Sequence, residues 1–377
     1  MRFLHTADWH LGRTLGGHPL HEDQEYLLGG QFVDIVRDTR PDAVLIAGDL
    51  FDRMAPPADA VELLDDILHR IIGLGVPVVL IPGNHDEAKR LGFGARLLGA
   101  AGLHIAHSAT GSAVRFADAH GEVTVVASGY ASPALLATLP GFEGIADHDS
   151  GFGLLCPMLH GKCPAGGRRV LVAHGFVAGG AECESERGLM VGGTGQIAAA
   201  RFAGFHYTAL GHLHRPQTLG DGRIRYSGSP LAYSASEAGQ DKSVTLVELD
   251  AAGAVRTTEV PLAPRRPFRL LEGSFAALRA APQAGRGDFV AITLTDPTPV
   301  PEAQRHLAEL YPRIVSLRYA ATQHCHEASS PPRRDRRAVR PLELFAAFHA
   351  AMRGAPLPDA ARGVVAAAIG AAEAAQA

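Results

Sequence analysis

Residues 43–52, with the sequence Ala-Val-Leu-Ile-Ala-Gly-Asp-Leu-Phe-Asp, carry the pattern that decides the fold. An apolar run suited to a buried strand stops at Gly48, and acidic side chains follow at Asp49 and Asp52. Open α/β sheets place their functional sites at the carboxyl ends of such strands. We therefore expect these acids to face a site at one edge of a sheet.

Four more motifs of metal-ligand residue types follow other apolar runs in the same way. They are Asp8-Trp9-His10, Gly83-Asn84-His85-Asp86, Ala173-His174-Gly175 and Gly211-His212-Leu213-His214. In the first and last, an extended backbone would project residues two apart to one side, where they could hold one ion together. Each motif alone is compatible with an ordinary turn or a core histidine. Their joint occurrence predicts one site built from five strand ends.

The set of ligands favours two divalent ions over one. Seven oxygen and nitrogen donors exceed the needs of a tetrahedral zinc site, but they suit two manganese, iron or magnesium ions that share a carboxylate. Two ions roughly 3.5–4 Å apart can activate a water and hold the attacking and leaving oxygens in a displacement at phosphorus. The expected chemistry is therefore phosphoester hydrolysis.

The order of these motifs resembles the calcineurin-like metallophosphoesterase superfamily. Further segments narrow the resemblance to the SbcD family, the nuclease subunits of bacterial SbcCD complexes: His5-Thr-Ala-Asp-Trp-His-Leu-Gly12, Tyr226-Ser-Gly-Ser-Pro-Leu231 and Ser236-Glu-Ala-Gly-Gln240. The resemblance runs from Met1 to about Tyr319 and continues more weakly to the end. It implies an α/β fold, a four-layer sandwich of two packed β-sheets flanked by helices, with a small α/β capping domain and a C-terminal helical element.

The resemblance also implies a role for each site residue. One ion would be held by Asp8, His10, Asp49 and His214. The second ion would be held by Asn84, His174, His212 and the shared Asp49. His85 would be the catalytic histidine, which stabilises the pentavalent phosphorus or protonates the leaving oxygen, and Asp52 would orient it. Arg53 would either meet a substrate phosphate or form a surface ion pair with a neighbouring acid.

Length and composition fit such an enzyme without identifying it. A chain of 377 residues, 46% of them hydrophobic, can form one large core and one or two smaller units. No apolar stretch is long enough to span a bilayer, and no leader-like segment precedes the first strand. We therefore expect a cytoplasmic protein without membrane contact.

The cysteines form no CxxC pair and no regular framework, which favours free thiols in a reducing compartment. They are Cys156, Cys163, Cys183 and Cys325. Cys156, His160 and Cys163 lie close together in sequence. They could form a small accessory metal site without a clear fourth ligand, or belong to a flexible glycine-rich insertion.

Net charge is the one global property that argues against an unaided DNA-binding protein. The formal charge is −4, whereas nonspecific DNA binding depends on neutralising phosphates with Lys and Arg. Any grip on DNA must therefore be local or shared with a partner. The densest basic segment, Arg333 to Arg337, is also compatible with a solvated linker.

The alternation of elements predicts the domain boundaries. Strands near 2–6, 43–47 and 77–81 alternate with amphipathic stretches near 22–38 and 57–73, and five further strands are expected between residues 123 and 249. Residues 1–262 would form the metallophosphoesterase domain and 263–322 a βαβαβ capping domain. Residues 323–340 would be a basic, proline-containing linker, and 341–377 C-terminal helices.

The terminal helices would either pack on their own domain or dock on a partner. We favour docking, because the predicted linker separates their apolar faces from the main core. The resemblance names the partner as the coiled-coil base of an SbcC-type ATPase, and it implies a homodimer within a heterotetramer.

The motifs thus predict two-metal phosphoester hydrolysis, and the resemblance implies a manganese-dependent DNA nuclease subunit, exonuclease and endonuclease, that acts on duplex ends and hairpins in DNA repair, recombination and replication. One alternative is a phosphodiesterase or phosphatase acting on small nucleotides or phosphoproteins, because the motifs specify phosphoester chemistry more firmly than substrate. A second is a scaffold subunit that no longer cuts, although every ligand position and His85 are intact.

Overall fold

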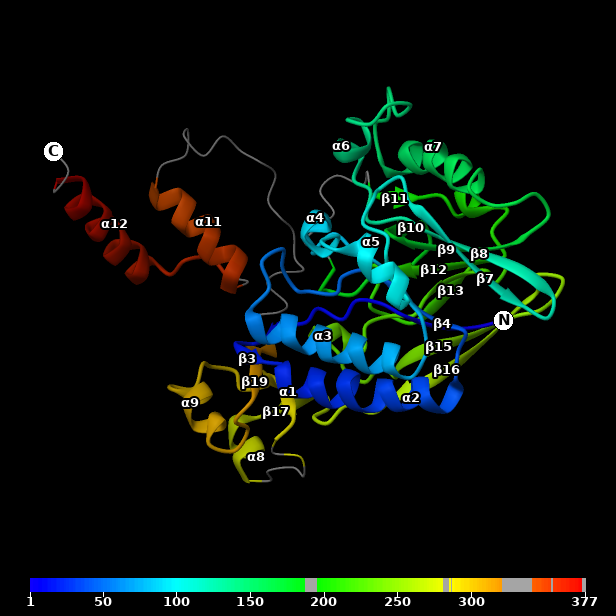
Figure 1. The fold of residues 1–377 in the computed structure, drawn as a ribbon. Coiled ribbons are helices and arrows are strands. Elements are labelled where there is room, and N and C mark those ends of the chain that lie inside the picture. Colours follow the sequence, from blue (N-terminus) through cyan, green and yellow to red (C-terminus); the bar gives the residue numbers. More distant parts are fainter. Residues whose placement is uncertain (187–194, 281–284, 286, 321–340, 354, 375–377) are drawn as a thin grey trace. The chain divides into compact units, whose positions relative to one another are not determined.

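The computed structural model describes residues 1–186, 195–280, 285, 287–320, 341–353 and 355–374 (Figure 1). The chain divides into two compact units, Met1–Arg269 and Leu270–Ala377. The predicted linker, the basic run from Arg333 to Arg337 and Cys325 lie outside the described residues.

The first sheet of the larger unit has six strands and carries three of the expected motifs. Their order is β16 (Val255–Leu262), β15 (Lys242–Leu249), β1 (Arg2–Thr6), β4 (Ala43–Ala47), β5 (Val78–Ile81) and β6 (Leu103–Ile105). Strands β1, β4, β5 and β6 run parallel to one another. At the other edge, β15 pairs antiparallel with β1, and β16 pairs antiparallel with β15. The segments after β1, β4 and β5 therefore leave the sheet at the same edge.

The second sheet also has six strands. Their order is β13 (Gln217–Leu219), β14 (Ile224–Tyr226), β12 (Tyr207–Gly211), β9 (Arg168–His174), β8 (Gly121–Ala127) and β7 (Ser112–Asp118). The four central strands are parallel to one another. The His174 motif ends β9, and the His212 and His214 motif follows its neighbour β12.

Buried apolar side chains join the two sheets face to face. The inner faces contribute Phe3, Leu45, Val79, Val125, Val172 and Tyr207, all fully buried. On one outer side lie α1 (His21–Gln24), the π-helix η1 (Glu25–Phe32), α2 (Val33–Thr39) and α3 (Ala58–Gly73), and on the other lies α7 (His148–His160) (Figure 1). The expected α/β architecture of two packed sheets flanked by helices is confirmed.

Short elements connect these layers. The helical ones are α4 (Ala88–Leu91), α5 (Ala95–Leu98), η2 (Gly99–Ala101), α6 (Pro133–Leu136), η4 (Ala199–Phe202) and η5 (Ala235–Glu237). The strands are β2 (Thr14–Leu15), β3 (His18–Pro19), β10 (Phe176–Val177) and β11 (Gln196–Ile197).

The flexible insertion considered for Cys156, His160 and Cys163 is wrong. Cys156 and His160 lie in α7, which begins at a capping box between Asp147 and Ser150 and buries Cys156 in the core, and Cys163 follows the end of this helix. Burial raises the pKa of the Cys156 thiol to about 12, which opposes the thiolate that a metal would need. Among the described cysteines, Cys156, Cys163 and Cys183 are free thiols, as expected.

The smaller unit contains a three-stranded sheet, with the order β17 (Phe268–Gly273), β18 (Phe289–Leu294) and β19 (Ile314–Tyr319). Helices α8 (Phe275–Ala280) and α9 (Ala303–Ala308) contribute to its core, where Leu278, Ile292 and Leu307 are buried. Helices α11 (Pro341–Arg353) and α12 (Asp359–Ala374) follow and contact each other. None of the helices in the described part of the chain has the length and apolarity needed to cross a membrane.

Candidate metal centre

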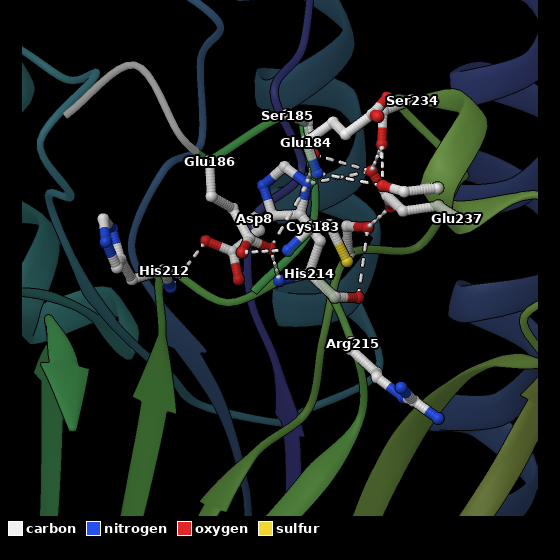
Figure 2. A network of polar contacts seen from close by, with 12 residues as sticks. Asp8, Cys183, Glu184, Ser185, Glu186, His212, His214, Arg215, Ser234 and Glu237 are labelled. Atoms are coloured by element: carbon white, nitrogen blue, oxygen red, sulfur yellow. Dashed lines mark hydrogen bonds and ion pairs between the residues drawn. The ribbon is translucent and has the colours of Figure 1, made fainter. Parts of the chain in front are cut away.

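The carboxyl ends of five strands, three from one sheet and two from the other, bring the predicted site residues together. The main-chain N–H of His212 donates to Asp8 Oδ1 over 2.9 Å (Figure 2), and His174 Nδ1 lies 2.8 Å from the carbonyl oxygen of Ala47. Because each of these contacts joins the two sheets, the site depends on the packing of the whole sandwich.

The backbone at the site is unusual. Among the described residues other than glycine, positive φ angles occur at Asp8 (54°), His10 (45°), Asp49 (50°) and His212 (105°), and elsewhere only at Arg40 and Glu302. Such left-handed conformations are costly for residues with a Cβ and persist only where the surroundings enforce them. The expectation that Asp8 and His10, or His212 and His214, share one side of an extended strand is therefore wrong. They lie in loops beyond the strand ends, and tertiary contacts bring them together.

Two glycines allow these loops to approach one another closely. A Cβ built on Gly83 would lie 2.1 Å from Asp49 Oδ1, and one on Gly211 would lie 2.0 Å from the carbonyl oxygen of Ala47. Neither space can hold even a methyl group. The glycine in each of these motifs is therefore a steric requirement of the site.

The ligands proposed for the first ion form one buried group. Asp8, His10 and His214 place one ligand atom each within 4.8 Å of one another, and the Nε2 atoms of the two histidines are 3.1 Å apart. Asp8 Oδ2 is buried and lacks a hydrogen-bond partner. Buried oxygens are normally paired, so an orphaned carboxylate oxygen beside two imidazole nitrogens fits a cation.

The ligands proposed for the second ion surround Asn84. Its Oδ1 lies 2.9 Å from His174 Nε2 and 3.0 Å from His212 Nδ1. Asp49 stands between the two groups, with Oδ2 3.5 Å from His174 Nε2 and 3.7 Å from His10 Nε2. This central position is the one that a bridging carboxylate would occupy.

Burial and charge set the protonation states of these groups. Burial lowers the pKa of His212 to about 3 and holds the pKa of His10 well below its ordinary value, which keeps both rings neutral and able to ligate. Burial opposes ionisation of Asp49, but His174, together with His10 and His85, outweighs it and holds the pKa of Asp49 below its ordinary value. Burial likewise lowers the pKa of His174, and Asp49 raises it to a higher net value. Asp49 and His174 therefore form an ion pair while no cation is bound.

His85 is held at the rim of this cluster by main-chain contacts. Its main-chain N–H donates to Asp49 Oδ1 over 2.9 Å, and its ring Nδ1 lies 2.8 Å from the main-chain oxygen of Asp52. A carbonyl can only accept, so Nδ1 carries the proton and Nε2 remains for chemistry. The contact to His85 therefore comes from the main chain of Asp52 and not from its carboxylate.

The Asp52 carboxylate has other partners. Arg13 Nη1 donates to Asp52 Oδ1 over 3.1 Å, and the Arg13 guanidinium stacks over the Tyr233 ring. Arg53 Nη2 is 4.0 Å from Asp52 Oδ2, and its side chain is 61% exposed. Arg53 thus has the surface ion pair considered for it, with its guanidinium free to meet solvent.

Several residues that hold the site were not identified from the sequence. Gln24 Nε2 donates to the carbonyls of Trp9 and His10, and the Asp86 carboxylate accepts from the main-chain N–H groups of Leu50, Phe51 and Gly83. Glu186 and Glu237 contact His214. Asp86 and Glu237 belong to quoted motifs and were given no role, whereas Gln24 and Glu186 have no motif to mark them.

A family model described as calcineurin-like phosphoesterase matches residues 1–216, more than half of the chain and all of the predicted ligands. The chain belongs to the calcineurin-like phosphoesterase family. Enzymes of this family use divalent metals, and the structure contains candidate metal-binding clusters, such as Asp8, His10 and His214. The protein is therefore a metal-dependent phosphoesterase.

A second family model, SbcD_C, described as type 5 capsule protein repressor C-terminal domain, matches residues 264–353. A calcineurin-like phosphoesterase domain followed by an SbcD_C domain is the combination that the resemblance to the SbcD family predicts, so that resemblance is confirmed.

Two solved structures illustrate the similarity of this phosphoesterase to known proteins. One is a 5′-nucleotidase precursor from Thermus thermophilus, at 16% identity and a TM-score of 0.37, over 70% of this chain and 54% of that one. The chain thus spans about half the length of that relative. Another matches at 12% identity and a TM-score of 0.39, over 68% of this chain and 98% of its own.

Proposed function

We propose that this phosphoesterase is the DNA nuclease subunit of an SbcCD-type complex and hydrolyses phosphodiester bonds at duplex ends and hairpins through two divalent ions, with manganese favoured over iron or magnesium. The observation that carries the proposal is the convergence of all seven predicted ligands and His85 at one edge of the sandwich. The match of the following segment to SbcD_C supports the choice of a nuclease over other phosphoesterases.

The first of the proposed ligand sets is supported by the buried Asp8 Oδ2, which lacks a hydrogen-bond partner. Asp8, His10 and His214 would hold the first ion with Asp49, and Asn84, His174 and His212 would hold the second with the same Asp49. When bound, such a pair of ions lowers the pKa of a water and neutralises charge on the phosphate.

His85 would act on the leaving group. Because its Nδ1–H is committed to the Asp52 carbonyl, a second proton must reside on Nε2, the only nitrogen from which it can be passed to a leaving oxygen. This contact also fixes the plane of the ring. Asp52 would thus orient His85 through its main chain, and Arg53 would remain available to a substrate phosphate.

The partner proposal rests on exposed apolar side chains in the C-terminal helices. Phe345 and Phe348 of α11 are 41% and 59% exposed, and Val364 of α12 is 71% exposed. We assign residues 341–377 to docking on the coiled-coil base of the SbcC-type ATPase, and residues 263–322 to capping the DNA. The docking assignment is supported because large apolar side chains that are exposed to water are favourably buried against a partner protein.

A second exposed group supports the proposed homodimer. Phe93 and Leu97, in and around α4 and α5, are 87% and 82% exposed. In the proposed heterotetramer this segment would be covered by a second copy of the chain. Replacing both residues with Ser should then yield a monomer by sedimentation, whereas an unchanged assembly would contradict this placement of the dimer interface.

The deciding experiment is cleavage of an end-labelled duplex and of a hairpin in manganese, with Asp49→Ala as the contamination control. Cleavage by the wild-type protein alone supports the nuclease. Hydrolysis of a small phosphodiester without cleavage of DNA, even when the ATPase is added, would favour the small-nucleotide or phosphoprotein enzyme. Absence of both activities in protein with two bound metals would favour the scaffold.

A chain truncated after Arg340 tests the partner assignment. We expect it to lose retention by the immobilised ATPase while keeping hydrolysis of a small phosphodiester. Unchanged retention would contradict docking through the terminal helices.

A further inference from the structure

A polar network around Glu237 contacts His214 on the side away from His212 (Figure 2). Its centre is Glu237, whose side chain has no solvent exposure. Glu237 Oε2 accepts from Lys242 Nζ over 2.7 Å, and Oε1 accepts from the hydroxyls of Ser185 over 2.7 Å and Ser234 over 2.9 Å. The lysine and this ring of donors keep Glu237 as a carboxylate, which can only accept hydrogen bonds.

Ser185 connects the Glu237 carboxylate to His214. Its Oγ lies 2.7 Å from Glu237 Oε1 and 2.9 Å from His214 Nδ1. A hydroxyl has one hydrogen, and Glu237 has none to give, so the Ser185 hydrogen must point to Glu237. His214 Nδ1 is then left to donate to Ser185 Oγ, and its proton is fixed on Nδ1.

The tautomer of His214 follows from this chain of hydrogen bonds. With the proton on Nδ1, Nε2 carries the lone pair, and it is Nε2 that lies 3.1 Å from His10 Nε2. Ligating histidines commonly have a hydrogen bond from the other ring nitrogen that fixes their orientation and increases their basicity. Here Nδ1 lies 2.9 Å from Ser185 Oγ and, more distantly, 3.4 Å from Glu237 Oε1; these residues are 29 and 23 positions away from His214.

The main chain of His214 is held by the same network. Lys242 Nζ donates to the His214 carbonyl over 3.0 Å, and the Ser229 N–H donates to it over 3.1 Å. The His214 N–H donates to Glu186 Oε1. The main-chain polar groups of His214 are thus fixed by buried partners, and its Nδ1 by the half-buried Ser185.

We propose that Ser185, Glu237 and Lys242 are positioning residues that lock His214 in its Nδ1–H tautomer and so set the affinity of one of the two metal positions. The inference rests on the proposed function, because it takes the pair of ions as given. A hydrogen-bond network with a purely structural role would stabilise the loops without determining which nitrogen of His214 is protonated.

Metal binding by two serine variants tests the proposal in the full chain. Ser185→Ala and Ser234→Ala each remove one hydroxyl from the same Glu237 oxygen, but only Ser185 contacts His214. In titrations with manganese alone, Ser185→Ala should weaken one of the two sites by about 10–100-fold and spare the other. Ser234→Ala should bind both ions as the wild type does. Equal binding by Ser185→Ala and wild type, or equal losses in both variants, would overturn the proposal.

A spectroscopic measurement reports the tautomer directly. Imidazole nitrogen NMR of the metal-free wild-type chain, with the His214 signals assigned by their loss in His214→Gln, should show the proton on Nδ1. In Glu237→Gln the new amide can donate to Ser185 Oγ, which frees the Ser185 hydrogen for His214 Nδ1 and should shift the proton toward Nε2. A wild-type proton on Nε2 would refute the inference. Should Glu237→Gln fail to fold, Ser185→Ala and the wild-type spectrum still decide the matter.

The two hypotheses fail in different ways. Wild-type protein that takes up no manganese would contradict the proposed two-metal function, and the tautomer would still be measurable. Wild-type protein that binds two ions while His214 carries its proton on Nε2 would contradict only the positioning network.

Discussion

The Nδ1 atom of His85 donates a 2.8 Å hydrogen bond to the main-chain carbonyl of Asp52, while the Asp52 carboxylate accepts from Arg13. The main-chain carbonyl and the carboxylate of Asp52 therefore accept hydrogen bonds from different residues. A side-chain substitution at position 52 removes the carboxylate and leaves the carbonyl in place.

This separation predicts unequal effects at the two positions. We expect His85→Ala to reduce the rate of phosphodiester cleavage by about 10²–10⁴-fold, because a general acid is lost, and to leave metal content unchanged. Asp52→Ala should reduce the rate less than His85→Ala does, because the main-chain carbonyl of residue 52 still orients His85. Initial rates and bound metal should be measured together, with the exposed His69→Ala as the control. Loss of both metals in His85→Ala would contradict its assignment to chemistry.

Asp49→Ala should lose metal as well as activity, because its carboxylate lies between the two groups of ligands. Manganese at a hundred times its dissociation constant should stabilise the wild-type protein by about 2.7 kcal/mol per site, since only the folded state binds it. Thermal melting with and without manganese should therefore show a shift in the wild type that Asp49→Ala lacks. Asp66→Ala, which alters an exposed acid on α3, should behave as the wild type. Full metal content in Asp49→Ala would refute the bridging role.

Gly83→Ala should destabilise the protein and disturb Asp49. The added methyl group would lie 2.1 Å from Asp49 Oδ1 and 2.4 Å from its main-chain nitrogen, so the backbone must move. We expect a loss of about 1–3 kcal/mol in the free energy of unfolding, measured in urea, together with weaker metal binding. Gly30→Ala is the matched control, because nothing lies within 4 Å of its added Cβ. Equal stability of the two variants would contradict the steric role of Gly83 beside Asp49.

Asp118 should contribute stability that disappears in acid. Its carboxylate accepts two hydrogen bonds from the buried Arg168, and this pairing holds the pKa of Asp118 below its ordinary value. The stabilisation is therefore complete above the unfolded-state pKa of about 3.9 and is lost as the pH falls toward the folded-state pKa. Asp118→Asn should lose about 1.5–3 kcal/mol of unfolding free energy at pH 7, and its difference from the wild type should shrink below about pH 4.

The control for this measurement is Asp221→Asn, which breaks an exposed pair with Arg223 whose side chains are 67% and 57% exposed. Such surface pairs contribute little, so its urea midpoints should follow the wild type across the pH series. A constant difference between Asp118→Asn and the wild type from pH 7 to pH 3 would contradict the linkage.

Much of the first sheet and the identity of the candidate ligands could be predicted from the sequence. Strand β4 occupies residues 43–47 as expected, because a continuous apolar run ended by a glycine is a local signal. The helix from Pro341 was also expected from its periodicity. Strand β16 was missed because its half-exposed residues at a sheet edge lack such a run. Helix α7 was missed because its glycines and Pro157 obscured the helical pattern.

The sequence by itself determined which residue types gather at the strand ends, because each motif lies next to the strand that positions it. Only the tertiary structure decided how they are held. The left-handed backbone at Asp8 and Asp49 and the carbonyl contact to His85 depend on packing between separate loops. The hydrogen bonds from Gln24 to the His10 carbonyl, and from His214 to Ser185, likewise join residues 14 and 29 positions apart in the chain. Such partners have no local signature, since their proximity results from the burial of two sheets against each other.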